Sequence, residues 1–157
     1  RLSLYLQKEL DSISEGFSYF SDVEYNRNRG QIKTMIDDEY IEIPIVCDLI
    51  LHSRGCYEYP NDNLIAVEMK KSNRSPDEKQ KDLNRLKILT KSDANKEGFP
   101  ENVCGYTLGY YLEFNIQKKT YIIKEYQDGQ YVKKTDERSI DDILTDEHFK
   151  MIRENVL

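Results

Sequence analysis

Two apolar stretches that carry charged residues decide the fold of this chain: IVCDLILH at residues 45–52 and LIAVEMKKS at residues 64–72. Dense apolar runs of this length, separated by a segment rich in turn-forming residues, are typical of adjacent central strands in a buried sheet. A charged side chain inside such a strand costs several kcal/mol unless it is paired or binds a metal. We therefore expect Asp48, Glu68 and Lys70 to satisfy one another or to build a site.

The spacing of these charged residues indicates hydrolytic chemistry. Glu68 and Lys70 are two residues apart, so on a strand they point to the same face. Asp48 lies twenty positions before Glu68, which leaves room for strand pairing that brings both carboxylates together. Facing carboxylates repel and raise each other's pKa, and a divalent cation such as Mg²⁺ relieves this repulsion. Because a lysine beside such a cation can orient an attacking water, the pattern indicates hydrolysis of a phosphodiester.

Helices are expected on both sides of the central pair. Residues 2–13 place Leu6 and Leu10 at helical spacing among polar residues, which predicts an amphipathic helix that ends near Gly16. A second helix begins at Ser75, where Pro76 and Glu78 complete a capping box, and runs to about residue 90. A last helix is expected to begin at Ser139 or Thr145, with an apolar side made of Ile143, Leu144, Phe149, Ile152 and Val156.

Further strands are predicted from alternating apolar and polar residues, and the turns between them from Gly, Asn and Asp. The expected strands cover residues 20–27, an Ile-rich region at 31–37 and 39–45 with an acidic turn, and residues 104–115, 119–126 and 130–134. The expected turns lie at residues 28–30 and 128–129.

Composition indicates a single domain over residues 1–157. The chain is 38% hydrophobic and 11% aromatic, which counts against disorder. It has neither an apolar run long enough to span a membrane nor the features of a signal peptide, and its three cysteines lack CxxC spacing. We therefore predict a cytoplasmic protein with reduced thiols and no membrane partner. The absence of an initiator Met at Arg1 indicates that upstream residues are missing.

Charge is unevenly distributed along the chain, whose net charge is −6. This balance counts against a protein that coats nucleic acid by bulk charge. However, residues 69–91 contain eight basic and three acidic residues, whereas residues 136–157 contain three basic and seven acidic ones. The basic segment directly follows the strand with Glu68, so it is a candidate for contacts with DNA phosphates. The candidate contacts are Lys71, Arg74, Lys79, Arg85 and Lys87; the alternative is a solvated helix face.

At these residues the sequence resembles the PD-(D/E)XK nuclease superfamily, with Asp48 on one strand and Glu68-Met69-Lys70 on the next as the E-x-K element. It is most similar in form to mostly uncharacterised bacterial members, and departs from the superfamily name at Cys47, where Pro is expected. The resemblance covers residues 1 to about 115. It is carried by the segments YLQKEL, VEYNR, DLILHSRG, NLIAVEMKKS, DLNRL and GYTLGYYLEF.

The resemblance implies an α/β fold with a restriction-endonuclease-like core. In that core a central mixed sheet is flanked by helices in the order helix, three strands, helix, strand, followed here by a C-terminal hairpin and helix. It also implies that Asp48 and Glu68 ligate Mg²⁺ or Mn²⁺, that the Met69 carbonyl is a possible further ligand, and that Lys70 orients the nucleophilic water.

Many members of the superfamily add a glutamate from the first helix. Glu9 and Glu24 are the candidates in this chain, unless that ligand lies upstream of Arg1. The alternative for Glu9 is a solvated helix residue, and for Glu24 a charge on the strand face or a partner of Arg27.

The first hypothesis is therefore a metal-dependent nuclease domain that acts on DNA in defence or repair, alone, as a homodimer or in a larger assembly. The second hypothesis is a catalytically inactive nuclease-like module whose binding face is the helix within residues 70–91, in which the charged residues form a structural ion-pair cluster. The third is an enzyme that uses the same carboxylates on a substrate other than nucleic acid.

Overall fold

The computed structural model describes residues 2–13, 18–23, 27–28, 31–32, 34–36, 42–44, 46–57, 61–92 and 104–141. Its helices are α1 (Leu2–Ile13) and α2 (Pro76–Leu89). Its strands are β1 (Phe20–Val23), β2 (Arg27–Asn28), β3 (Gln31–Ile32), β4 (Thr34–Ile36), β5 (Glu42–Pro44), β6 (Leu49–His52), β7 (Asn63–Lys71), β8 (Leu108–Asn115), β9 (Thr120–Gln127), β10 (Gln130–Lys134) and β11 (Arg138–Ser139).

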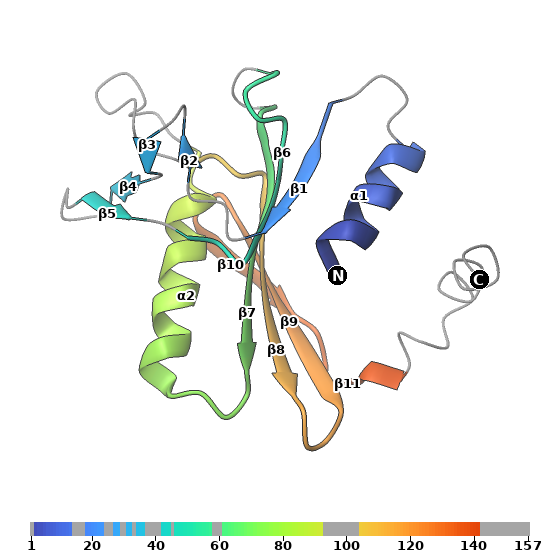
Figure 1. Ribbon diagram of the computed structural model, residues 1–157. Coiled ribbons are helices and arrows are strands. Elements are labelled where there is room, and N and C mark those ends of the chain that lie inside the picture. The colour runs from blue at the N-terminus through green and yellow to red at the C-terminus, as the bar shows by residue number, and fades with distance from the viewer. Residues whose placement is uncertain are drawn as a thin grey trace.

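Seven of these strands form one open sheet in the order β1-β6-β7-β8-β9-β10, with β11 also paired to β9. Strands β7 and β8 are parallel, and the other pairings of this sheet in the described residues are antiparallel. A parallel pair needs a crossover connection, and α2 provides it between β7 and β8 (Figure 1). The expected α/β fold with a central mixed sheet is confirmed.

The two helices lie on opposite sides of the sheet (Figure 1). On one face Leu86 and Leu89 of α2 pack in a cluster with Ile50 of β6 and Ala66 of β7. On the other face, Leu6 and Leu10 of α1 pack against Leu49, Leu51 and Val67. Alternate residues of β6 and β7 therefore face different helices, as the two-residue period of a strand requires.

The end of α2 lies close to β8, and Gly109 allows this approach. A Cβ atom at Gly109 would lie 2.8 Å from Thr90 Cγ2 and 3.4 Å from Leu86 Cδ2. The Thr90 hydroxyl donates to the Leu86 carbonyl and accepts from the Gly129 amide at 3.2 Å. Helix α2 is thus joined both to the middle of the sheet and to the β9–β10 turn.

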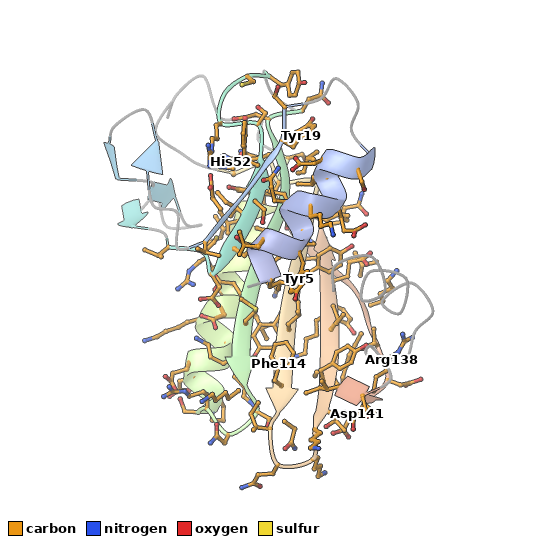
Figure 2. All side chains as sticks on the ribbon, turned by 45° about the vertical axis from the view of Figure 1, so that its right-hand side comes forward. Tyr5, Tyr19, His52, Phe114, Arg138 and Asp141 are labelled. Carbon is orange, nitrogen blue, oxygen red and sulfur yellow. The ribbon has the colours of Figure 1, made fainter. Side chains whose placement is uncertain are left out.

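Strand β1 is held at the edge of the sheet by a charged cluster. The carboxylate of Asp22 contacts His52 Nε2 at 2.9 Å and both Nε and Nη2 of Arg54, while Arg54 stacks over the Phe20 ring. These bonds lower the pKa of Asp22, chiefly through Arg54. His52 lies at the end of the sheet opposite to Phe114 (Figure 2). These contacts fix the edge strand β1 to β6 and to Arg54 beyond its end.

Several expected element boundaries are corrected by the structure. The strands expected from residues 45 and 104 begin at Leu49 and Leu108. The Ile-rich region does form strands: it holds β3 and the pair β4–β5, and both β2–β3 and β4–β5 are two-stranded sheets apart from the main one. Residues 138–139 form β11, before the expected helix, whose apolar side lies in residues 142–157, outside the described part of the chain.

The capping box of α2 is confirmed: the Ser75 hydroxyl accepts from the Glu78 amide, and the Glu78 carboxylate accepts from the Ser75 amide. We expect Ser75→Ala to lower the free energy of unfolding by about 1 kcal/mol, the usual effect of removing an N-cap side chain. Urea denaturation measures this loss. Lys81→Ala, on the exposed face of the same helix, is the control, and equal stability of the two variants would contradict the prediction.

Candidate active site

The structure brings Asp48, Glu68 and Lys70 to one face of the sheet. Leu49 pairs with Val67 in the antiparallel register of β6 and β7, so Asp48, one residue before β6, lies opposite Glu68. Directly opposed residues of an antiparallel pair point to the same side. That side is the one covered by α2, because Ile50 and Ala66, the next opposed pair that points to the same side, pack in the α2 cluster.

Asp48 closes the end of the β6–β7 ladder. Its Oδ2 accepts a hydrogen bond from the Met69 amide at 2.6 Å, and its side chain is half-buried. The carboxylate thus replaces a backbone acceptor at the point where β6 begins. The backbone pairing of β6 begins at the next residue, Leu49.

Glu68 is a buried acid in the middle of the sheet, with 1% of its surface exposed. Its Oε1 accepts from Arg85 Nη1 of α2 at 2.6 Å. Burial raises the pKa of Glu68 to about 7; Arg85 opposes this shift, and the negative charges of Asp48 and Asp82 add to it. Near neutral pH this carboxyl therefore exists in both protonation states.

Lys70 is held by a residue that our reading of the sequence missed. Its Nζ lies 2.8 Å from Oδ2 of Asp82 on α2, whose Oδ1 lies 3.5 Å from Arg85 Nη1. The contact with Asp82 raises the pKa of Lys70, which is therefore protonated. Asp82 lies four residues before Leu86, and Leu86 lies three residues before Leu89, so the three residues share one face of the helix. A charged residue on this buried face was the sequence signal that could have revealed the role of Asp82.

The two opposed acids have the chemistry of a hard-cation site. Asp48 and Glu68 each use one oxygen in the bonds above, and Asp48 Oδ1 and Glu68 Oε2 accept no hydrogen bond from the described residues. Within that part of the chain no three His, Cys, Asp or Glu side chains are grouped closely enough to hold a metal ion. Mg²⁺ commonly takes only one or two carboxylates and completes its shell with water and phosphate. The donor set fits such a cation, with Arg85 as its competitor.

The other predicted ligands were Met69, Glu9 and Glu24. The Met69 side chain packs on the α1 side of the sheet beside Leu49 and Val67. Its amide donates to Asp48, and its carbonyl stays a predicted ligand. Glu9 is on α1 and thus on the face opposite to Glu68, so the structure does not bring it to the carboxylate pair. Glu24 lies outside the described residues.

The cations predicted to contact DNA fall into two groups. Arg85 is bound to Glu68, and Lys79 Nζ binds Glu113 at 2.9 Å and the Ser72 carbonyl at 2.6 Å. The other three have exposed side chains, and Arg74 reaches its ion-pair partner Glu78 only at 3.9 Å. These three are Lys71, Arg74 and Lys87.

Comparison of the chain with protein-family models, with curated proteins and with solved structures gave no match. Neither described helix has the length and apolar character needed to cross a membrane. The side chains between β6, β7 and α2 are therefore the features of this protein that bear on its function.

Removal of Arg85 should destabilise the protein in a pH-dependent manner. The folded-state pKa of Glu68, about 7, lies above its ordinary value of 4.5, so the stability that the protonated carboxyl provides at acidic pH is lost as the pH rises through 7. Arg85→Met raises this pKa further. We expect a loss of about 3 kcal/mol of unfolding free energy near pH 8.5, as for other broken buried pairs, and a smaller loss near pH 5.5.

Urea denaturation at the two pH values measures both losses. Adding Glu68→Gln to Arg85→Met should recover stability mainly at the alkaline pH, because no buried charge then forms. Equal losses at both pH values would show that ionisation of Glu68 does not cause the loss of stability.

Proposed function

We propose that this domain hydrolyses DNA phosphodiesters with the help of a divalent cation, Mg²⁺ or Mn²⁺, and has a restriction-endonuclease-like core of the PD-(D/E)XK type. The observation that carries this proposal is the opposition of Asp48 and Glu68 at the end of the β6–β7 ladder, with Lys70 two residues further along the same face. The order α1, β1, β6, β7, α2, β8, in which three antiparallel strands precede a parallel crossover, supports it.

Each charged residue has a role in this proposal. Asp48 and Glu68 hold the cation, and Glu68 gives up its bond with Arg85 to do so. A bound cation supplies Lewis acidity and lowers the pKa of water. Lys70, protonated, orients the attacking water and stabilises the negative charge that develops on the phosphate. Asp82 holds the Lys70 ammonium in position at 2.8 Å, and acts only through that lysine.

A second candidate function is favoured by the ion pairs themselves. Glu68 is almost fully buried against Arg85, and Lys70 is paired with Asp82, so these four charges balance one another without any cation from solution. Asp48 is the third carboxylate and is bonded to the Met69 amide. Such a network is compatible with a catalytically inactive module that binds nucleic acid or protein. The two candidates differ in one property, because only the first requires Glu68 to exchange Arg85 for a divalent cation.

Cleavage assays test the first candidate. With a plasmid and a linear DNA fragment as substrates and Mg²⁺ present, we expect Asp48→Ala/Glu68→Ala to abolish cleavage. Lys70→Ala should lower the rate at least about a hundredfold, the usual effect of removing one preorganised charge. Glu9→Ala removes a carboxylate from the opposite face and should leave the rate unchanged. Cleavage by the double variant at the rate of the unchanged protein would refute the proposal.

Metal binding tests the same site without a substrate. Calorimetric titration with Mn²⁺ should show binding that Glu68→Ala abolishes and Glu9→Ala retains. Because the pKa of Glu68 is about 7, a cation must displace a proton below that pH, so affinity should rise between about pH 6 and pH 8. Absence of binding at every pH would favour the inactive module.

A further inference from the structure

Two turns lie side by side at the end of the sheet where β7 and β8 finish (Figure 1). The first turn connects β7 to α2, and the second connects β8 to β9. Lys71, the last residue of β7, pairs with Phe114 of β8, and the Ser72 amide donates to the Phe114 carbonyl at 2.8 Å. Phe114 marks this end of β8 (Figure 2).

The two turns carry exposed cations and no acidic residue. Residues 70–76 and 114–120 contain no Asp or Glu. The β8–β9 turn has a defined shape, because the Lys118 amide donates to Asn115 Oδ1 at 3.1 Å and Lys119 adopts a left-handed conformation with φ 53°. Four exposed side chains form what we call the turn patch: Lys71, Arg74, Lys118 and Lys119.

Some of the acids near the turn patch are bonded to other groups, and Asp77 and Asp141 are exposed. Glu113 on β8 is paired with Lys79, Glu137 accepts from the Thr120 hydroxyl, and Glu78 approaches Arg74 only at 3.9 Å between exposed side chains. An exposed pair of that length holds its partners weakly. By contrast, Arg85 of α2 is paired with Glu68. The turns therefore offer exposed cations for phosphate contacts, as do Lys81 and Lys87 of α2.

The turn patch lies beyond the end of β7 and extends over three strands. Lys71 is three residues beyond Glu68 on β7, about 10 Å at 3.3 Å per residue, and its side chain points to the other face of the sheet. The turns reach from β7 across β8 to β9, about 10 Å at the usual spacing of neighbouring strands. Along one nucleic-acid strand, with about 3.4 Å of axis per phosphate, this width covers about three phosphates.

We infer that Lys71, Arg74, Lys118 and Lys119 bind successive phosphates of a nucleic-acid strand at the end of the sheet where β7 and β8 finish. That the bound strand is a substrate rests on the proposed function; that the patch binds phosphates does not. Lys118 and Lys119 are the new element of this surface, since they come from a separate turn beyond the basic segment of the sequence.

Fluorescence anisotropy with a labelled DNA duplex of about 20 base pairs, in buffer containing EDTA, tests the patch without cleavage. We expect Lys118→Glu/Lys119→Glu to raise the Kd about tenfold and to reduce the slope of log K against log salt by about two, since each phosphate contact contributes about 0.9. Lys133→Glu/Lys134→Glu makes the same charge change on the exposed edge strand β10. That control should change the Kd less than about twofold.

Circular dichroism melting establishes that each variant folds, and Lys71→Ala/Arg74→Ala tests the patch from the other turn if the first variant does not fold. Equal weakening by the two charge reversals would overturn the inference, because bulk charge would then explain binding. Absence of DNA binding by the unchanged protein would also overturn it. Binding through the patch without any Mg²⁺-dependent cleavage would refute only the proposed hydrolysis.

Discussion

Burial of a carboxylate in the middle of the sheet is the constraint on which the rest of this structure depends. Glu68 sits on β7 with 1% of its surface exposed, and a charge in that position must be compensated. Arg85 provides the compensation from α2, and Asp82, on the same helix, binds Lys70. The polar contacts of α2 with β7 thus hold the helix over the strand end that carries the candidate site.

The same ion pair is compatible with both candidate functions, the nuclease and the inactive module. The ion pair with Arg85 compensates the buried charge of Glu68. One oxygen of Glu68 and one of Asp48 accept no hydrogen bond from the described residues. A nuclease needs this pair to open for a cation, whereas an inactive module needs it to stay closed. The pKa of about 7 for Glu68 shows that the pairing with Arg85 does not fully offset the effect of burial.

Sequence patterns predicted the parts of this protein that depend on local physics. The capping box at Ser75, the hairpin turn at Asp128-Gly129 and the shared face of Glu68 and Lys70 follow from spacing alone, and the structure has all three. Asp82 and the turn patch depend on which elements lie together in space. The start of β6 was misplaced because periodicity does not reveal where backbone pairing with the neighbouring strand begins.

The central claim is that Glu68 exchanges Arg85 for a divalent cation held together with Asp48. A crystal structure of the protein soaked in Mn²⁺ at about pH 8 tests this most directly, through the anomalous signal of the metal. We expect a Mn²⁺ peak bound by both carboxylates, with the Arg85 guanidinium moved away from Glu68. An Arg85–Glu68 pair still at its distance of 2.6 Å, with no anomalous peak beside Asp48, would contradict it.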